Sequence, residues 1–283
     1  MNSYEQITKQ IIKNLEQANT WVDMINAQNP INITGRPYNG INIMLLFNSE
    51  HKSRIWGTFN QIIKHGGKIK KGQKSSIVGF WSKYQPKPTK EDKNPKELWY
   101  LKIYRVFNVD QCEFIEGNEY LEHLQGKLNE DPISALPSEV ISDYLSREDI
   151  TLQTNKKPQT LPFYSPKKDL ISITQRSLYK SNDEYYMTLF HELTHSTGHP
   201  KRLNRFEVGS SKFGTQEYSL EELVAEIGAN FLSAETGLNP DFLNSVGYIK
   251  HWIPSLKEHP RWIVSAASKA EKAVAFIMVP NSR

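Results

Sequence analysis

The spacing of apolar residues predicts different kinds of element in the two halves of the chain. Residues 3–18 carry isoleucines and a leucine at helical spacing, which predicts an amphipathic helix. Short apolar runs separated by glycine turns follow, and such runs are typical of strands. The predicted strands are 53–59, 68–69, 76–81 and 98–108, with a short helix at 41–47. The first half is therefore expected to be a small mixed α/β domain.

The second half is predicted to consist mainly of helices placed after two short strands. These elements are strands at 161–164 and 170–173 and helices at 183–195, 218–233, 240–256 and 260–278. Asn182 or Asp183 is expected to cap the first of these helices, and Ser219 the second. Strand 170–173 is either an edge strand that pairs with an extended peptide or a covered internal strand. Together the two halves predict an α+β protein with domains at 1–130 and 131–283.

One predicted helix carries the sequence His191-Glu192-Leu193-Thr194-His195. Residues four apart lie on one face of a helix, so the imidazoles of His191 and His195 can reach the same zinc ion. Glu192 lies beside that position and can take a proton from a water molecule. The plainer alternative is a helix whose histidines only cap or pack. The spacing favours a metal site with Glu192 as its general base.

Two carboxylates on the next predicted helix are candidates for a third metal ligand. Glu222 and Glu226 lie one turn apart, and in many zinc peptidases the first acid of such a pair binds the metal. The second then orients a ligand histidine. We therefore predict Glu222 as the ligand and Glu226 as the supporting residue or the alternative ligand. Glu221 is expected on a solvated face, and His199 is expected to have a local structural role. The candidates for an oxyanion donor are Tyr185, Tyr218 and His199.

The composition excludes several other classes of protein. Cys112 is the only cysteine among 283 residues, which excludes an internal disulfide and a zinc site built from several cysteines. No apolar run reaches the length of about 18 residues that a membrane span needs. The N-terminus lacks the apolar segment of a signal peptide. We therefore expect a cytoplasmic protein with no membrane partner.

The net charge of +4 is modest, but the lysines are concentrated in one window. Residues 64–90 contain eight lysines and no acidic residue, with Phe80, Trp81 and Tyr84 between them. Cations that follow a phosphate backbone, next to aromatic rings that stack on bases, are what single-stranded DNA requires. A solvated lysine hairpin over a core aromatic is the alternative. The predicted DNA contacts in this window are Lys68, Lys70, Lys71, Lys74 and Trp81.

Several of these segments, taken in order, resemble one known family. HELTHSTGHPKRLNR and then YSLEELVAEIGANFL are similar to the metallopeptidase-like domain of ArdC-type antirestriction proteins. The N-terminal signature NITGRPYNGIN, at residues 32–42, is similar to the other half of that family, as are residues 56–59, 66–72 and 104–108. One departure is Ser196, where an aromatic residue is expected and where the change is predicted to alter the cleft wall.

The resemblance implies a single-stranded-DNA-binding domain followed by a zincin-like domain. It implies a plasmid-borne protein that protects DNA entering by conjugation from host restriction, and it adds Arg36 and Tyr38 to the predicted DNA contacts. The implied cofactor is Zn²⁺ or another divalent metal such as Mn²⁺. The implied partners are single-stranded DNA and a protein substrate or host restriction enzyme. The alternatives are a non-catalytic DNA-occluding protein with a vestigial metal site and a toxin-like protease delivered with the DNA.

Overall fold

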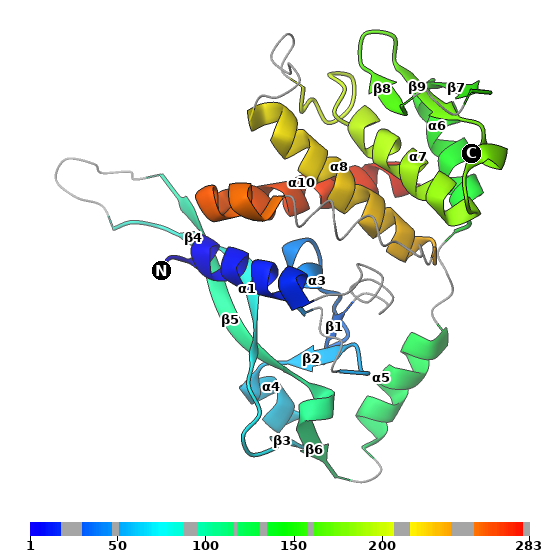
Figure 1. Ribbon diagram of the computed structural model, residues 1–283. Coiled ribbons are helices and arrows are strands. Elements are labelled where there is room, and N and C mark those ends of the chain that lie inside the picture. The colour runs from blue at the N-terminus through cyan, green and yellow to red at the C-terminus, as the bar shows by residue number, and fades with distance from the viewer. Residues whose placement is uncertain are drawn as a thin grey trace.

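The fold was analysed in a computed structural model, in which helices and strands are mixed as the sequence predicts (Figure 1). The structure describes residues 1–17, 30–46, 51–87, 96–115, 118–130, 135–157, 161–206, 216–238 and 252–279. Among these residues, no helix has the length and apolar character needed to cross a membrane.

A four-stranded sheet with a long hairpin forms the centre of the N-terminal half (Figure 1). Its order is β1-β2-β5-β4, and β4 pairs with β5 in antiparallel register along its whole length. Two further strands, β3 and β6, form a separate small sheet. The strands are β1 (Ile31–Asn32), β2 (Ile55–Gly57), β3 (Gly67–Ile69), β4 (Ser76–Tyr84), β5 (Leu98–Asn108) and β6 (Cys112–Phe114). Because β4 lies at the end of this order, its outer edge is free of other strands in the described part of the chain.

The predicted strand at 53–59 ends earlier than its apolar pattern suggested. Thr58 is the N-cap of helix α4 (Phe59–Lys64), and its hydroxyl accepts a hydrogen bond from the backbone of Gln61. The Gln61 side chain accepts a hydrogen bond from the backbone of Thr58 in return, which completes a capping box. This local signal therefore decides where the strand ends and the helix begins. The capping signal was missed because aromatic and isoleucine residues continue through it.

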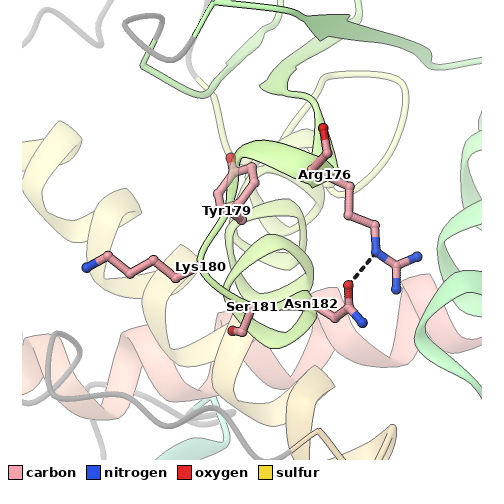
Figure 2. Close-up of a pocket in the computed structure, with 6 residues that line it drawn as sticks. Arg176, Tyr179, Lys180, Ser181 and Asn182 are labelled. Carbon is pink, nitrogen blue, oxygen red and sulfur yellow. Dashed lines mark hydrogen bonds between the residues drawn. The ribbon is translucent and has the colours of Figure 1, made fainter.

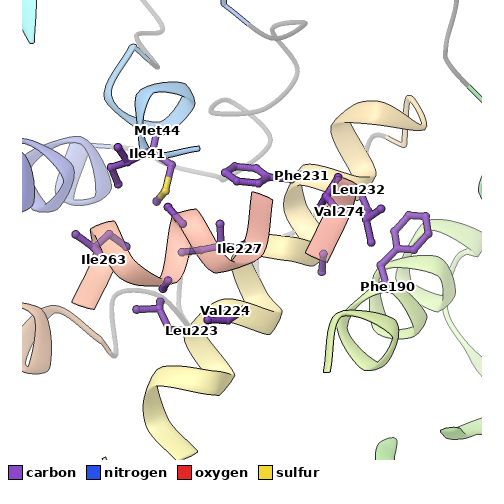
Figure 3. Close-up of a cluster of buried hydrophobic side chains, with 14 of the residues drawn as sticks. Ile41, Met44, Phe190, Leu223, Val224, Ile227, Phe231, Leu232, Ile263 and Val274 are labelled. Carbon is purple, nitrogen blue, oxygen red and sulfur yellow. The ribbon is translucent and has the colours of Figure 1, made fainter. Parts of the chain in front are cut away.

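The N-terminal helix α1 (Ser3–Gln17) packs against the C-terminal helix α10 (Arg261–Met278) as well as against the hairpin (Figure 1). Ile7, Ile11 and Leu15 are fully buried, and they belong to a hydrophobic cluster that includes residues of the C-terminal half. Helix α3 (Ile41–Leu46) joins the same cluster, and Figure 3 shows it beside α10. The two halves therefore share one core, and the boundary near residue 130 stays a prediction.

A three-stranded sheet and a group of helices form the C-terminal half (Figure 1). The sheet order is β7-β9-β8, with β7 (Thr151–Asn155) parallel to β9 (Leu170–Thr174) and β8 (Phe163–Ser165) antiparallel to it. The edge-strand hypothesis for residues 170–173 is therefore wrong, because β9 is the central strand with Ile171 and Ile173 fully buried. The internal-strand alternative is confirmed, and β8 is the strand next to helix α7 (Asn182–Ser196).

The remaining helices surround this sheet and the shared core. Ser181 caps α7 in place of the predicted Asn182 or Asp183, and its hydroxyl accepts from the backbone of Glu184. Helix α8 begins at Gln216, so the predicted cap Ser219 lies inside it. The remaining elements are α5 (Glu119–Glu130), α6 (Pro137–Glu148), α8 (Gln216–Glu235), a helical segment at 252–258 and 3-10 turns at Val109–Gln111 and Arg176–Leu178. Most of the predicted helix at 240–256 lies outside the described residues.

Candidate metal centre and aromatic hairpin

The two histidines of α7 and a carboxylate of α8 converge on one point. The Nε2 atoms of His191 and His195 lie 3.0 Å apart. The two carboxylate oxygens of Glu222 lie 3.5 Å from His191 Nε2 and 3.5 Å from His195 Nε2. Ligand atoms in a tetrahedral zinc site are about 3.4 Å apart when each is about 2.1 Å from the ion. These three side chains therefore have the spacing of ligands to one divalent ion.

The second ring nitrogen of each histidine faces another carboxylate of α8. His191 Nδ1 lies 3.4 Å from Glu226, and His195 Nδ1 lies 3.5 Å from Glu221. A proton shared with a carboxylate at Nδ1 leaves the lone pair of a neutral imidazole on Nε2. Both Nε2 atoms can then bind a metal, so the donor set of two imidazoles and one carboxylate fits a divalent ion.

Glu221 is part of this centre, although the sequence pattern placed it on a solvated face. Only 13% of its side chain is exposed, and Arg205 donates to both of its carboxylate oxygens, at 2.7 and 3.0 Å. Arg205 also donates to the carbonyl oxygen of Thr194 at 2.8 Å and to the hydroxyl of Thr197 at 2.7 Å. The expectation for Glu221 is therefore wrong, because the turn after α7 folds back over this side of α8.

A second buried arginine connects the turn after α7 with the sheet. Arg202 donates to the carbonyl oxygen of Ser196 at 2.8 Å, to the hydroxyl of Tyr164 at 2.9 Å and to the carboxylate of Asp169. Tyr164 lies on β8, and its backbone N–H donates to the carboxylate of Glu192. Arg202 therefore fixes the position of β8, and the backbone of β8 in turn bonds Glu192. Sequence reasoning missed both arginines, although both stand in the segment that carries the family resemblance.

The charges of the centre perturb one another strongly. Glu192 is 5% exposed, and burial raises its pKa above the usual value although both histidines lower it. Burial by itself would lower the pKa of His195, but hydrogen bonds to Glu221 and Glu222 raise it to about 10. The pKa of Glu222 is lowered by its bonds to both histidines, against the effect of burial. The carboxylates that surround the two imidazoles therefore favour positive charge between them, whether as protons on the rings or as a bound cation.

The close approach of α7 and α8 depends on a glycine in α8. A Cβ atom at Gly228 would lie 2.5 Å from Thr194 Cγ2 and 2.7 Å from its hydroxyl oxygen. Carbon atoms in contact prefer separations of about 3.5–4.0 Å, so any larger residue would push the helices apart. Thr194 immediately precedes His195, so this contact sets the distance between the histidines and the carboxylates of α8.

The departure at Ser196 lies in the interior, and its effect on a cleft wall stays a prediction. Ser196 is fully buried, and its hydroxyl lies 3.0 Å from the hydroxyl of Tyr144. Tyr144, from α6, is also fully buried there. An aromatic side chain therefore does pack against this end of α7, but it is Tyr144 of α6.

Two of the three candidates for an oxyanion donor are engaged in local contacts. His199 Nδ1 accepts from the backbone of Lys201 at 3.1 Å, in keeping with its expected local role. Tyr185 is held between Tyr179 and Tyr186, near the start of α7. The side chain of Tyr218 lies outside the described residues.

A surface hollow of about 600 Å³ lies at the start of α7, near the helix end opposite His195 (Figure 2). Its polar groups bond within the same loop. Arg176 Nε donates to the side-chain oxygen of Asn182 at 2.7 Å, and Ser181 caps the helix (Figure 2). Because these groups hold the loop together, we assign the hollow no ligand.

The hairpin of β4 and β5 carries aromatic side chains on both faces. Alternation along paired strands places Phe80, Tyr100, Lys102 and Tyr104 on one face and Trp81 on the other. Phe80 is 43% exposed and contacts Tyr104 edge to face at 5.8 Å. Lys102 Nζ lies 5.0 Å above the ring of Tyr104. Sequence reasoning predicted this second strand but did not include its aromatic residues among the DNA contacts, because they lie beyond the lysine-rich window.

Trp81 lies on the face that packs on α1. It is 49% exposed and contacts Tyr4 at 6.4 Å. On the same face, Lys83 Nζ lies 4.8 Å above the ring of Trp99. Both faces of the hairpin therefore carry exposed rings beside lysine side chains.

The predicted basic contacts are exposed, but they lie at the base of the hairpin. Lys68 is on β3, and Lys70, Lys71 and Lys74 are in the segment between β3 and β4. The ammonium group of Lys70 donates to the carbonyl oxygen of Asp110 at 3.0 Å. Arg36 is also exposed.

Tyr38 has a different position from that expected of a DNA contact. It is 3% exposed and packs in a cluster with Trp56 and Val78. Its hydroxyl accepts a hydrogen bond from Asn32. A base cannot stack on a buried ring, so we leave Tyr38 out of the proposed DNA surface.

Comparisons with known proteins match both halves of the chain. Residues 1–107 match the family model for the N-terminal domain of anti-restriction factor ArdC, and residues 141–269 match a model for a zincin-like metallopeptidase. The chain is 32% identical to the metal-free crystal structure of the antirestriction protein ArdC from plasmid R388, with a TM-score of 0.76. The match covers 98% of this chain and 97% of that one. This chain belongs to the ArdC antirestriction family.

Other relatives in this family differ in ligand or in length. The Mn(II)-bound crystal structure of the R388 ArdC is 31% identical, with a TM-score of 0.72 over 98% of this chain and 97% of that one. Two proteins from Escherichia coli named DNA primase TraC are 31% and 33% identical over 97% and 89% of this chain. The chain spans 27% and 18% of their lengths. The predicted fold, an N-terminal ArdC domain followed by a zincin-like domain, is confirmed.

Proposed function

We propose that this ArdC family member is a metal-dependent peptidase that also binds single-stranded DNA and protects the incoming DNA of a mobile element. One observation supports the enzymatic part of this proposal. The Nε2 atoms of both α7 histidines converge with Glu222 beside the buried carboxyl of Glu192. A purely structural metal site has no need of that carboxyl. The zincin-like match supports zinc, and the Mn(II)-bound relative supports a broader choice of divalent metal.

The side chains of the centre have distinct roles in this proposal. A divalent metal, when bound by His191, His195 and Glu222, supplies a Lewis acid that lowers the pKa of water and polarises a carbonyl group. Glu192 accepts a proton from the attacking water and returns it to the leaving amine nitrogen. Its raised pKa makes the carboxylate a stronger base toward the attacking water.

Neighbouring groups hold these side chains in place. Glu226 and Glu221 each hold one histidine ring through Nδ1, which fixes the direction of its Nε2 lone pair. The backbone of Tyr164 reaches Glu192, and β8 ends the sheet order, so this edge strand lies beside the base. An extended peptide could pair with that edge and present its backbone to the centre.

The enzymatic part is tested by metal analysis together with a comparison of cleaved proteins. Purified protein should hold about one divalent ion per chain, and His191→Ala or His195→Ala should remove it. Glu192→Gln should keep the metal, because this residue is a base and not a ligand. Proteomics of restricting cells should then show cleavage products with the wild type that Glu192→Gln lacks. Equal protection of unmodified DNA by both proteins, with no difference in cleavage, would reduce the protein to a non-catalytic DNA-occluding factor.

The DNA-binding part rests on the hairpin. Exposed rings with lysines above them offer stacking and charge to a flexible strand without reading its sequence. Fluorescence anisotropy of the full-length chain with labelled oligothymidine at several salt concentrations tests this. The full chain is needed because α1 and α3 share a core with α10. Binding that weakens steeply with salt is expected, and no binding at low salt would refute this part.

A further inference from the structure

A cavity of about 260 Å³ lies where the N-terminal signature, the hairpin and the C-terminal helix α10 meet. The signature NITGRPYNGIN contributes one wall, through Pro37 and residues 39–42. Phe80 and Trp81 of β4 contribute the second wall. Helix α10 contributes the third, through Val264, Ser268 and Glu271, which recur at helical spacing. The cavity therefore unites a signature from the first half with a helix from the second.

The carboxylate of Glu271 lies against the backbone of Gly40. A Cβ atom at Gly40 would be 2.7 Å from Glu271 Oε2, and the φ of +56° at this residue also favours glycine. Within the described part of the chain, this carboxylate accepts no hydrogen bond and forms no ion pair. Its partial burial raises its pKa above the usual value. Among the described residues, Lys272 supplies only a longer-range charge interaction, so both carboxylate oxygens can accept hydrogen bonds from a ligand.

The free edge of β4 supplies a donor beside this acceptor. The side chain of Asn42 bonds both the N–H and the carbonyl of Gly79, at 2.8 and 2.9 Å, in the place of a neighbouring strand. Outward-facing backbone groups alternate along a strand, so the N–H and carbonyl of Trp81 point to the same edge. The half-exposed ring of Phe80 borders the cavity and offers a face for stacking.

We propose that this cavity holds one unstacked guanine base of single-stranded DNA and that Glu271 reads it. The proposal rests on the single-stranded-DNA binding proposed above. Guanine alone carries two adjacent donors, N1–H and the N2 amino group, on its Watson–Crick edge, and these match the two oxygens of a carboxylate. Adenine, cytosine and thymine each place an acceptor next to their donor, which a carboxylate repels. The O6 atom of guanine can accept from a backbone N–H such as that of Trp81.

The position of Glu271 predicts a second property. A carboxylate beside a DNA strand repels phosphates, so it weakens binding to any sequence that lacks guanine. Its removal should therefore strengthen binding to oligothymidine while it abolishes the preference for guanine. Loss of a residue with only a structural role would instead weaken binding to oligothymidine and to the guanine-containing strand alike.

The test measures the affinity of the full-length protein for oligothymidine of about 15 nucleotides, with and without one central guanine. A single guanine avoids structures that guanine-rich DNA forms by itself. The wild type should bind the guanine-containing strand about tenfold more tightly, as expected for one bidentate contact to a base. Glu271→Gln should remove this preference. The control Glu258→Gln, which removes the same charge from an exposed residue outside the cavity, should keep it.

Two modified bases sharpen the test. Inosine lacks the N2 amino group and should lose most of the preference. The base 7-deazaguanine keeps the whole Watson–Crick edge and should retain it. If the protein binds the inosine-containing strand as tightly as the guanine-containing strand, recognition by a carboxylate is contradicted.

The remaining outcomes separate this proposal from the proposed function. If oligothymidine binds but one guanine makes no difference, the guanine cavity is refuted and single-stranded-DNA binding stands. If guanine is preferred equally by the wild type and Glu271→Gln, the base is read elsewhere and the assignment to Glu271 is wrong. If no single-stranded DNA binds, the cavity proposal is refuted together with the DNA-binding part.

Discussion

Replacement of Gly228 by alanine should weaken metal binding far more than it weakens folding. The added Cβ would lie 2.5 Å from Thr194 Cγ2. Carbon contacts of about 3.5 Å require α7 and α8 to separate by roughly 1 Å. Metal-ligand distances tolerate errors of only about 0.2 Å. Glu222 on α8 then cannot share one ion with His191 and His195 of α7, and we expect metal affinity to fall by at least about tenfold, as with other losses of ligand geometry.

The cost to folding should be smaller, because two effects oppose each other. Overpacking of this contact costs about 1–3 kcal/mol, whereas replacement of glycine by alanine within a helix returns about 1 kcal/mol. The net loss of about 0–2 kcal/mol is small beside a typical unfolding free energy of about 5–15 kcal/mol. The variant should therefore fold and still bind metal weakly.

Two measurements check this prediction. Competition with a chromophoric chelator gives the metal affinity, and urea unfolding of the metal-free protein gives the stability. Gly126→Ala in α5 is the matched control, because a Cβ there would meet no atom within 4 Å. Thr194→Ala, added to Gly228→Ala, removes the two closest atoms and should restore much of the affinity.

Two results would refute the reasoning. If Gly228→Ala binds metal as tightly as Gly126→Ala, the close approach at Thr194 does not set the ligand geometry. If adding Thr194→Ala to Gly228→Ala restores no metal affinity, the loss of affinity in Gly228→Ala has another cause.

The other predictions concern single groups of the two sites. Glu222→Ala should abolish tight metal binding, whereas Glu226→Ala and Glu221→Ala should each weaken it by about 10–100-fold, as measured by chelator competition. A metal-bound crystal structure with Glu226 or Glu221 at ligand distance would reverse this assignment. Arg202→Met should cost about 3–5 kcal/mol in urea unfolding, because it leaves the carboxylate of Asp169 without its ion-pair partner and with only the Tyr164 hydroxyl as a donor. An unchanged midpoint would contradict this. Joint replacement of Lys68, Lys70 and Lys71 by alanine should reduce the salt dependence of DNA binding, whereas Trp81→Ala should lower affinity with little change in that dependence. Equal salt slopes for the triple variant and the wild type would remove these lysines from the DNA surface.

The sequence by itself determined the features that covalent geometry controls within a few residues. Helical periodicity places His191 and His195 on one face, whatever surrounds the helix. The apolar run at residues 98–108 predicted β5 with its observed bounds. Spacing also pointed to Glu222, and the structure brings that residue to both histidines.

Only the tertiary structure decided which elements meet. A strand pattern shows that Ile171 and Ile173 are buried, but it does not show that β9 has a neighbour on each side. The sequence could not show that Arg205 reaches back to Glu221, because that contact depends on a turn folding over another helix. Likewise, packing within the N-terminal half buried Tyr38, and packing between the two halves formed the cavity beside Glu271. Such contacts depend on how close two surfaces can come, and at Gly228 that distance is set by a missing side chain.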